Sequence, residues 1–171
     1  VNALGPTLNA GQRRALRLTL EHRMTVITGG AGTGKSYSLE AICKAFDDRD
    51  LKVVLCAPTG KAAKRMEEAT GRQAHTIHRL LGYNGSDFQL QGPIDADLLA
   101  VDEMSMVGVP LCWHLLRAVD LTRTVVVLIG DQHQLLPVEC GAVLRDLIAT
   151  KALPVAMLDT VVRQAGTLKE N

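Results

Sequence analysis

Short runs of apolar residues recur along the chain and alternate with segments that have helical periodicity. The runs at 24–28, 52–57, 98–101, 124–129 and 153–158 are rich in Val, Leu and Ile and lack regular alternation with polar residues. Strands that are buried on both faces have this character, and they pair in parallel sheets that helices cover. The pattern predicts an α/β domain of about five strands, with a mostly parallel central sheet and helices on both faces.

Helices are predicted before and between these strands. Asn9 is suited to cap a helix that runs to about Glu21, because Leu16 and Leu20 lie one turn apart on an apolar stripe. A second helix is predicted at about 35–47. The cluster of Gly, Asn, Ser and Asp at 82–87 predicts a polar turn that joins a small hairpin. Neither a repeat nor a convincing linker divides the chain, so a single domain is expected.

Residues 29–36 read Gly-Gly-Ala-Gly-Thr-Gly-Lys-Ser and lie between a predicted strand and a predicted helix. This is the phosphate-binding P-loop pattern: glycines let backbone N–H groups close around an anion, and the following helix presents its positive end. Lys35 is expected to reach the outer phosphates, and Ser36 to offer its hydroxyl to Mg²⁺. A glycine-rich turn that binds nothing is the alternative, which the flanking elements disfavour. The expected nucleotide contacts are Gly30, Ala31, Gly32, Thr33, Gly34, Lys35, Ser36 and Tyr37.

Two carboxylates, Asp102 and Glu103, follow the apolar run at 98–101. Behind a P-loop, this arrangement places a Mg²⁺ ligand and a water-activating base beside the phosphates. We expect Asp102 to hold the metal through water and Glu103 to polarise the attacking water. Gln134 follows the next run, at the sheet edge where such folds bind ligands, and is a candidate sensor of the γ-phosphate. Standing alone, it would be interpreted as an ordinary surface glutamine.

The segment at 57–80 also begins at a strand end and turns into a basic helix. Between 60 and 80 it carries five Lys or Arg residues against two Glu residues. Charge alone leaves two interpretations open: a solvated helix face with Lys64 and Glu68 paired, or a track for a nucleic-acid backbone with histidines that stack on bases. His75 and His78 are spaced like metal ligands, but no third ligand is placed for them.

Composition and charge limit the partners, metal sites and cellular location that the sequence predicts. The net charge of +1 predicts no nucleic-acid partner by itself, so any DNA contact must come from a local patch. The four cysteines are widely spaced and form no CxxC pair, so neither a disulfide nor a zinc site is expected. No run is long enough to span a membrane and no signal peptide is evident, which predicts a cytoplasmic protein without a membrane partner. The absence of an initiator Met suggests a piece of a longer protein.

Taken in order, the motifs resemble the first motor domain of superfamily-one DNA helicases, and most closely the RecD-like branch that moves 5′ to 3′. The resemblance spans nearly the whole chain. Its segments are 8–12 (the Q motif), 29–36 (motif I), 57–66 (motif Ia), 76–81, 101–106 (motif II), 130–141 (motif III) and 162–164 (the motif IV region).

The resemblance implies a RecA-like P-loop domain that uses ATP and Mg²⁺ to move along single-stranded DNA. It implies that Gln12 reads adenine, that Gln134 links the γ-phosphate to DNA and that Arg163 reaches the γ-phosphate. It also raises the DNA-track interpretation above the solvated-helix one. The single-strand contacts expected on this basis are Pro58, Thr59, Gly60, Lys61, Arg65, Thr76, His78 and Arg79.

The sequence departs from this family in two respects. Met104 stands where a small residue is common after the acidic pair. More seriously, motifs V and VI of a second RecA-like domain have no counterpart, so 1–171 is expected to be one motor domain. The second domain would lie in the same longer chain or in a partner subunit, and the isolated chain would hydrolyse ATP slowly if at all.

Other classes of P-loop protein share parts of this pattern. A small-molecule kinase or GTPase is disfavoured, because no guanine-reading NKxD motif is present and the acidic pair suits attack by water. The motor domain of a relaxase-linked conjugative helicase remains an alternative. So does a P-loop ATPase switch without unwinding activity.

Overall fold

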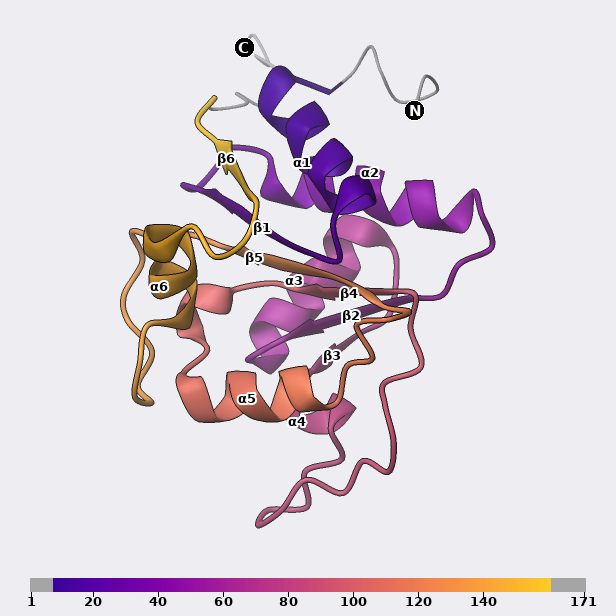
Figure 1. The fold of residues 1–171 in the computed structure, drawn as a ribbon. Helices are drawn as coiled ribbons and strands as arrows, with labels where there is room; N and C mark the ends of the chain where they lie inside the picture. The colour runs from indigo at the N-terminus through magenta and orange to yellow at the C-terminus, as the bar shows by residue number, and fades with distance from the viewer. Residues whose placement is uncertain (1–7, 161–171) are drawn as a thin grey trace, which may run out of the picture.

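The computed structural model describes residues 8–160 and centres on a six-stranded sheet whose strands are all parallel (Figure 1). The strand order is β3-β2-β4-β5-β1-β6. The strands are β1 (Met24–Gly29), β2 (Val53–Ala57), β3 (Ala74–Thr76), β4 (Leu98–Val101), β5 (Val125–Gly130) and β6 (Val155–Leu158). The predicted α/β class with a parallel central sheet is confirmed.

Helices cover both faces of the sheet (Figure 1). One face carries α1 (Ala10–Glu21), α2 (Lys35–Asp47) and α3 (Gly60–Thr70), and the other carries α4 (Ile77–Leu80), α5 (Val109–Arg117) and α6 (Val143–Thr150). A short 3-10 turn, η1 (Met104–Met106), follows β4. Within the described residues, none of these helices is long and apolar enough to cross a membrane.

The central strands bury side chains in two separate cores. In β1, Ile27 belongs to the core under α1 to α3, and its neighbour Val26 belongs to the core under α4 to α6. Successive side chains of a strand point to opposite faces, so a strand covered on both sides needs apolar residues at every position. This requirement explains the continuous apolar runs from which the sheet was predicted.

The predicted number of strands was too low, because the structure contains a sixth strand, β3. It is only three residues long, reads Ala-His-Thr and pairs with β2 through Leu55↔Ala74 to Ala57↔Thr76. Such a segment has no apolar run, and its backbone becomes a strand only by pairing with β2 at the edge of the sheet. The predicted hairpin turn at 82–87 is present, with an isolated antiparallel bridge between Tyr83 and Phe88.

The strand connections diverge between β1 and β5. After β1 the chain passes through α2 on one face toward β2, whereas after β5 it passes through α6 on the other face toward β6. The two strands are neighbours, with Thr28 opposite Gly130. A point where the connections of adjacent parallel strands leave in opposite directions opens a crevice at their carboxyl ends, which is where open α/β sheets bind ligands.

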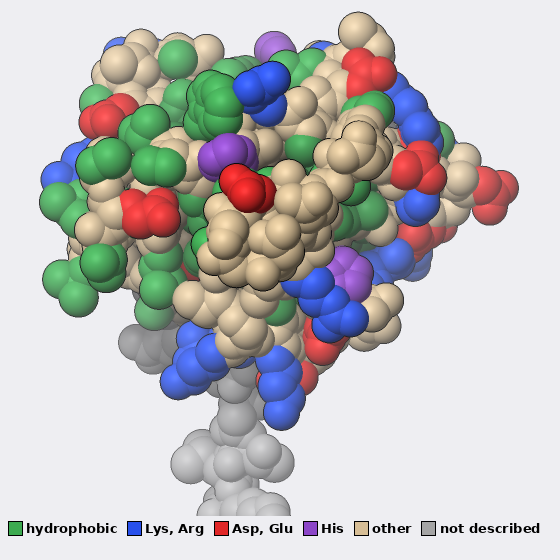
Figure 2. Space-filling view, turned by 90° about the horizontal axis from the view of Figure 1, so that it is seen from below, with side chains coloured by type: hydrophobic (Ala, Val, Ile, Leu, Met, Phe, Trp, Pro, Cys, Tyr) green, Lys and Arg blue, Asp and Glu red, His purple; other side chains and the backbone are tan. Residues whose placement is uncertain are grey.

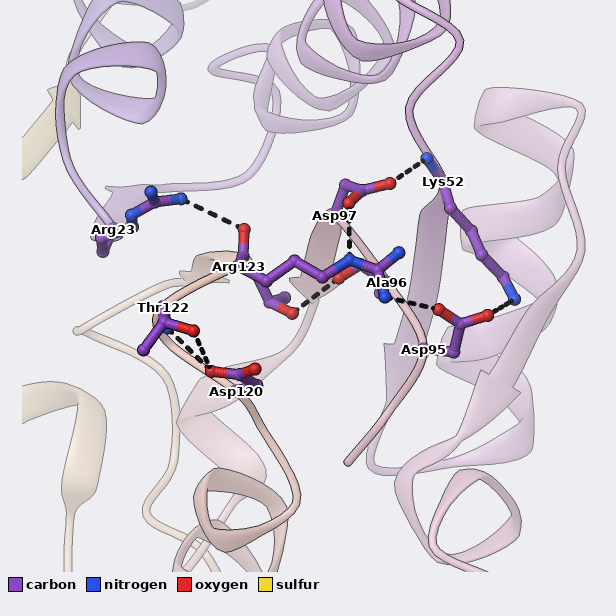
Figure 3. A network of polar contacts seen from close by, with 9 residues as sticks. Arg23, Lys52, Asp95, Ala96, Asp97, Asp120, Thr122 and Arg123 are labelled. Carbon is purple, nitrogen blue, oxygen red and sulfur yellow. Dashed lines mark hydrogen bonds and ion pairs between the residues drawn. The ribbon is translucent and has the colours of Figure 1, made fainter. Parts of the chain in front are cut away.

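A polar network joins the segments that lead into four strands at the opposite, amino-terminal edge (Figure 3). Asp95 accepts from Lys52 Nζ at 2.7 Å and from Arg123 Nη1 at 2.8 Å, while Arg123 Nε donates to Asp97 at 2.9 Å. Arg23 Nη1 donates to the Arg123 carbonyl at 3.1 Å. The hydrogen bonds from Lys52 and then Arg123 lower the pKa of Asp95. Because the groups are exposed, we assign the network a role in aligning strand starts rather than a large stabilising energy.

Candidate functional site

The P-loop joins β1 to α2 through a backbone that requires glycine. Gly32 and Gly34 have φ values of 75° and 86°, in the left-handed region that other residues rarely adopt. A Cβ on Gly29 would lie 2.5 Å from the carbonyl oxygen of Leu158 in β6, so no side chain fits there. Helix α2 begins at Lys35 directly after this turn, and its first N–H groups, free of intrahelical partners, face the loop.

The side chain of Lys35 lies over the same loop. Its Nζ donates to the carbonyl oxygens of Gly29 at 2.6 Å and Gly30 at 2.9 Å. Thr33 Oγ1 donates to the same Gly30 carbonyl at 2.8 Å. The ammonium group is therefore held where the loop backbone curves, and its charge acts on Asp102 at the end of β4.

The acidic pair stands at the carboxyl end of β4. The N–H of Asp102 donates to the Cys56 carbonyl at 3.0 Å, and its Oδ1 accepts from the N–H of Glu103 at 2.8 Å. Burial is the main cause that raises the pKa of Asp102, and the charge of Glu103 raises it further, whereas the Glu103 N–H and Lys35 lower it. Glu103 has a φ of 53°, which is uncommon outside glycine and is a strain typical of functional positions.

Gln134 lies in the loop after β5 and contacts the turn that follows the acidic pair. Ser105 Oγ donates to Gln134 Oε1 at 3.2 Å. This approach depends on Gly130, since a Cβ there would lie 2.6 Å from Leu144 Cδ2 and 3.2 Å from the Ser105 nitrogen. Ser105 lies within motif II, but no contact was predicted for it. Nothing in the residue spacing identified it as the partner of Gln134.

The same loop carries an exposed apolar tip. Leu135 is 90% exposed and Val138 is 107% exposed, and Leu136 of the same loop is also exposed. Met106 of η1 and Val109 of α5 are exposed as well. In Figure 2, hydrophobic side chains gather on the left of the molecule, the side on which α6 and this loop lie in Figure 1. An apolar surface beside a site marks a place where another molecule or domain is expected to pack.

Gln12 lies in the first turn of α1 and is 2% exposed. The predicted cap is confirmed: Asn9 Oδ1 accepts from the Gln12 N–H, and Gln12 Oε1 accepts from the Asn9 N–H, both at 2.9 Å. A Cβ on Gly11 would lie 3.2 Å from Leu158 Cδ2, so this turn packs on the end of β6 beside β1. The cap therefore fixes the Gln12 side chain at the start of α1.

Tyr37 lies two residues after Lys35 of the P-loop, near the first turn of α1. A cavity of about 110 Å³ separates α2 from the segment that precedes α1. Its lining residues are Leu8, Tyr37, Glu40, Ala41 and Lys44.

The expected DNA contacts are brought together at the neighbouring part of the same edge. Thr59 caps α3 and accepts from the Ala62 N–H at 3.2 Å, and Thr76 caps α4 and accepts from the Arg79 N–H at 3.1 Å. Because Ala57 and Thr76 are opposite each other in the parallel pair β2–β3, these two caps emerge side by side. Each hydroxyl keeps its own hydrogen for donation.

Exposed cations flank the two caps. Lys61 and Arg65 on α3 and Arg79 on α4 are exposed, and a Cβ on Gly60 would meet no atom within 4 Å. His78 and Pro58 are partly exposed in the same segments. Arg72, which contributed to the positive charge counted from the sequence, instead forms a bidentate pair with Asp47 at the end of α2.

The residues suit a magnesium ion held mainly by a bound triphosphate. Ser36 in the first turn of α2 and Asp102 after β4 both lie at the carboxyl edge of the sheet. Over residues 8–160, no group of three or more His, Cys, Asp or Glu side chains is arranged to hold a metal. Mg²⁺ commonly takes one or two protein ligands and completes its shell with phosphates and water. Arg163 and the motif IV region lie outside the described residues.

A parallel α/β sheet with a P-loop after its first strand, and an acidic pair two strands away, defines a P-loop domain of the RecA-like type. The chain belongs to the AAA domain family, which matches residues 7–171.

Known proteins support a more specific resemblance. The chain is 46% identical over 161 residues to an ATP-dependent RecD2 DNA helicase of Deinococcus radiodurans, covering 93% of this chain and 22% of that protein. It is 37% identical to the RecBCD enzyme subunit RecD of Mycolicibacterium smegmatis, covering 80% of this chain and 30% of that protein. The predicted resemblance to RecD-like helicases is thereby confirmed. The chain spans less than a third of either relative.

The fold is also shared with a solved helicase structure. A crystal structure of Bacteroides sp Pif1 in complex with ADP-AlF4 superposes with a TM-score of 0.65 over 92% of this chain and 43% of that chain. At 22% sequence identity, this likeness establishes the fold alone.

The buried carboxylate of Asp102 predicts a stability cost that can be measured. Its pKa is raised in the folded chain, so folding favours the protonated form. The free energy of unfolding of the wild type, relative to Asp102→Asn, should fall as pH rises from about 4 through the raised pKa, and stay low above it. At pH 7 and without nucleotide, Asp102→Asn should therefore melt at a higher temperature than the wild type. Calorimetry across pH tests this, with Glu68→Gln on exposed α3 as the charge-matched control; an Asn variant that melts lower at pH 7 contradicts the assignment.

Proposed function

We propose that this chain is the ATP-binding first motor domain of a RecD-like DNA helicase. In this proposal it binds Mg·ATP at the carboxyl ends of β1, β4 and β5 and holds single-stranded DNA at the adjacent ends of β2 and β3. The observation that carries the proposal is the location of the P-loop, the acidic pair, Gln134 and the two threonine caps along one edge of one sheet.

ATP binding would exchange internal hydrogen bonds for phosphate contacts. Lys35 would turn from the carbonyls of Gly29 and Gly30 to the outer phosphates, which the N–H groups of the loop and of α2 also face. Ser36 and Asp102 would hold Mg²⁺, which neutralises phosphate charge when bound. Gln12 would read the adenine edge while it keeps its cap.

Hydrolysis requires an activated water molecule in line with the γ-phosphate. Glu103, placed beside Asp102 by its left-handed backbone, would polarise that water. Gln134, held through Ser105 to the turn that follows Glu103, would respond to the γ-phosphate. Arg163 would supply a further charge. The resemblance to RecD supports this last role.

Coupling to DNA would run through β4 and β2, the neighbouring strands at which the two sites meet. The Asp102 N–H bonds to the Cys56 carbonyl of β2, and β2 leads into Pro58 and the Thr59 cap. A shift of the β4 end on hydrolysis would therefore reach the DNA-contacting segment within one strand spacing. The 5′ to 3′ direction of movement is part of the proposal on the basis of the RecD relatives.

A second RecA-like domain is proposed to complete the motor, in the same longer chain or a partner subunit. The exposed apolar tip around Leu135 and Val138 supports packing of another domain at this edge. Since a supplied arginine contributes roughly 10³ to 10⁵ in rate to phosphoryl-transfer enzymes, the isolated chain should hydrolyse ATP slowly and should not translocate. Robust strand separation by the 171-residue chain would contradict this proposal.

One assay distinguishes the helicase motor from the alternatives. ATPase activity is measured with and without single-stranded DNA, on this chain and on a version extended through the next domain. DNA stimulation that appears in the longer form supports a motor half. ATP turnover that DNA does not stimulate in either form supports an ATPase switch. The relaxase-linked alternative shares this motor chemistry and is disfavoured by the identity to RecD proteins.

Substitutions at the phosphate site should separate nucleotide binding from hydrolysis. Lys35→Ala should abolish ATP binding, because it removes the ammonium from the loop. Glu103→Gln should leave the dissociation constant for ATP within about threefold while lowering kcat by about 10² to 10⁴, the usual contribution of a general base. Equilibrium binding of a fluorescent ATP analogue and steady-state turnover in the extended form check both, and an unchanged kcat for Glu103→Gln would exclude it as the base.

A substitution in the DNA track should act on DNA and spare the nucleotide. Lys61→Ala should weaken single-stranded DNA binding and reduce the slope of log K against log salt by about 0.7, the loss of one phosphate contact. Its ATP affinity without DNA should not change. Fluorescence anisotropy at several salt concentrations measures the slope, and Arg14→Ala, an exposed cation on α1, is the matched control. Equal losses for both variants would indicate nonspecific attraction.

The adenine contact of Gln12 can be separated from its role in the helix cap. Gln12→Glu keeps an oxygen that accepts from the Asn9 N–H but lacks the amide donor. It should weaken ATP binding about tenfold and, because its carboxylate is buried, also lower the melting temperature, whereas Asn9→Ala should cost about 1 kcal/mol of stability with a smaller effect on ATP. Calorimetry and nucleotide titration of the two variants provide the test. Unchanged ATP affinity in Gln12→Glu would remove adenine recognition from this residue.

A further inference from the structure

Aromatic side chains gather on the face covered by α4 and α5, away from the phosphate site. The chain has only five Phe, Tyr and Trp residues, and three of them lie here with two histidines and an arginine. We refer to this group as the aromatic strip, which consists of His78, Tyr83, Phe88, His114, Trp113 and Arg117.

The rings of the strip form one continuous series. Ring centroids are 5.2 Å apart for His78 and Tyr83, and 5.0 Å apart for Tyr83 and Phe88. They are 4.3 Å apart for Phe88 and His114, and 4.8 Å apart for His114 and Trp113. The Arg117 guanidinium lies 4.7 Å from the centre of the Trp113 ring and ends the series.

Part of the strip faces a solvent-accessible hollow. Trp113 is 52% exposed and Tyr83 is 42% exposed. The adjoining hollow has a volume of about 610 Å³ and is lined in part by Phe88, Trp113, His114 and Arg117. In Figure 2, which views the molecule from below, a histidine and a basic side chain adjoin hydrophobic side chains on this face.

Buried side chains and a backbone hydrogen bond anchor the loop that crosses this face. The loop is anchored by the buried side chains of Leu81 and Ile94 and by the Ile94 N–H, which donates to the Ala118 carbonyl at 2.7 Å. The Tyr83 hydroxyl donates to the Gly85 carbonyl at 2.9 Å within the same loop, but the exposed parts of the Tyr83 and Trp113 rings leave apolar surface open to solvent.

The strip is continuous with the proposed DNA track. His78 belongs to both, because it sits on α4 two residues after the Thr76 cap, and its carbonyl accepts from the Tyr83 N–H at 2.9 Å. From His78 the strip leads away from the sheet edge to Trp113 and Arg117 on α5. A strand that passes the two threonine caps could continue onto these rings without leaving the surface of the chain.

We propose that the aromatic strip is a second subsite for single-stranded DNA, in which bases stack on Trp113 and Tyr83 and Arg117 contacts a phosphate. The subsite rests on the proposed function, because it extends the DNA track. Stacking on aromatic side chains tolerates any base, because every base presents a π-face. The alternation of rings with His78, His114 and Arg117 suits bases and phosphates better than an aliphatic protein segment.

Two acidic residues lie near the strip, and one of them should weaken DNA binding. Asp120 accepts from the Thr122 N–H and hydroxyl, so its carboxylate is engaged within its own turn. Asp87 is exposed on the loop that carries Tyr83 and Phe88, and its charge opposes a phosphate. Asp87→Asn should therefore strengthen DNA binding about twofold.

Trp113 is the only tryptophan of the chain, so its fluorescence reports directly on the strip. The 171-residue chain is titrated with oligothymidine while anisotropy of a labelled oligothymidine measures total binding. We expect quenching of Trp113 that follows the same curve. Trp113→Ala should weaken binding about 5- to 10-fold, as loss of one stacked base does, whereas Trp113→Phe should stay within about twofold.

The outcomes separate the subsite from the proposed function. Binding by anisotropy without quenching, and with unchanged affinity in Trp113→Ala, overturns the subsite while the DNA track at Lys61 stands, and assigns the hollow to a protein partner instead. No binding by anisotropy under low salt overturns the DNA part of the proposed function and the subsite with it. Circular dichroism establishes that Trp113→Ala folds, and Tyr83→Leu provides a second variant that should also weaken binding.

Discussion

The parallel pairing of β1 with β5 is the constraint on which the candidate site depends. It places Thr28 opposite Gly130, so the P-loop and the loop that carries Gln134 start from adjacent strands and diverge to opposite faces. The Gln132 N–H reaches Thr28 Oγ1 at 3.4 Å across this point. Because Gly130 has no side chain, η1 packs directly on the end of β5, and Ser105 can reach Gln134. Slippage of this register would separate the phosphate loop from the acidic pair and from Gln134.

The site itself is costly to fold, and the rest of the domain offsets that cost. Burial raises the pKa of Asp102, and Glu103 holds a left-handed backbone without being glycine. A buried carboxylate and a strained backbone persist only where the surrounding packing holds them in place. Here the surroundings are two apolar cores, one on each face of the sheet, with β1 contributing Ile27 to one and Val26 to the other.

The sheet also explains why the proposed nucleotide site and the proposed DNA site occupy neighbouring parts of one edge. Nucleotide groups follow the central strands, and DNA groups follow β2 and β3 at one side, with β4 shared between them through the Asp102–Cys56 backbone bond. Parallel strands end at the same edge, so two sites built from loops after neighbouring strands lie close without any special contact. The aromatic strip lies beyond this edge, where the loop that follows α4 contacts α5.

Local chemistry made much of this structure predictable from the sequence. The buried strands, the Asn9 cap and the P-loop turn each depend on neighbours a few residues away, so their residue patterns alone specify them. Contacts across the fold were decided only by the tertiary structure: the strand β3, the Ser105–Gln134 bond, the Arg72–Asp47 pair and the assembly of Trp113 with Phe88 and Tyr83. Each joins segments whose separation along the chain carries no periodic signal. Only the packing of helices on the sheet brings them within bonding distance.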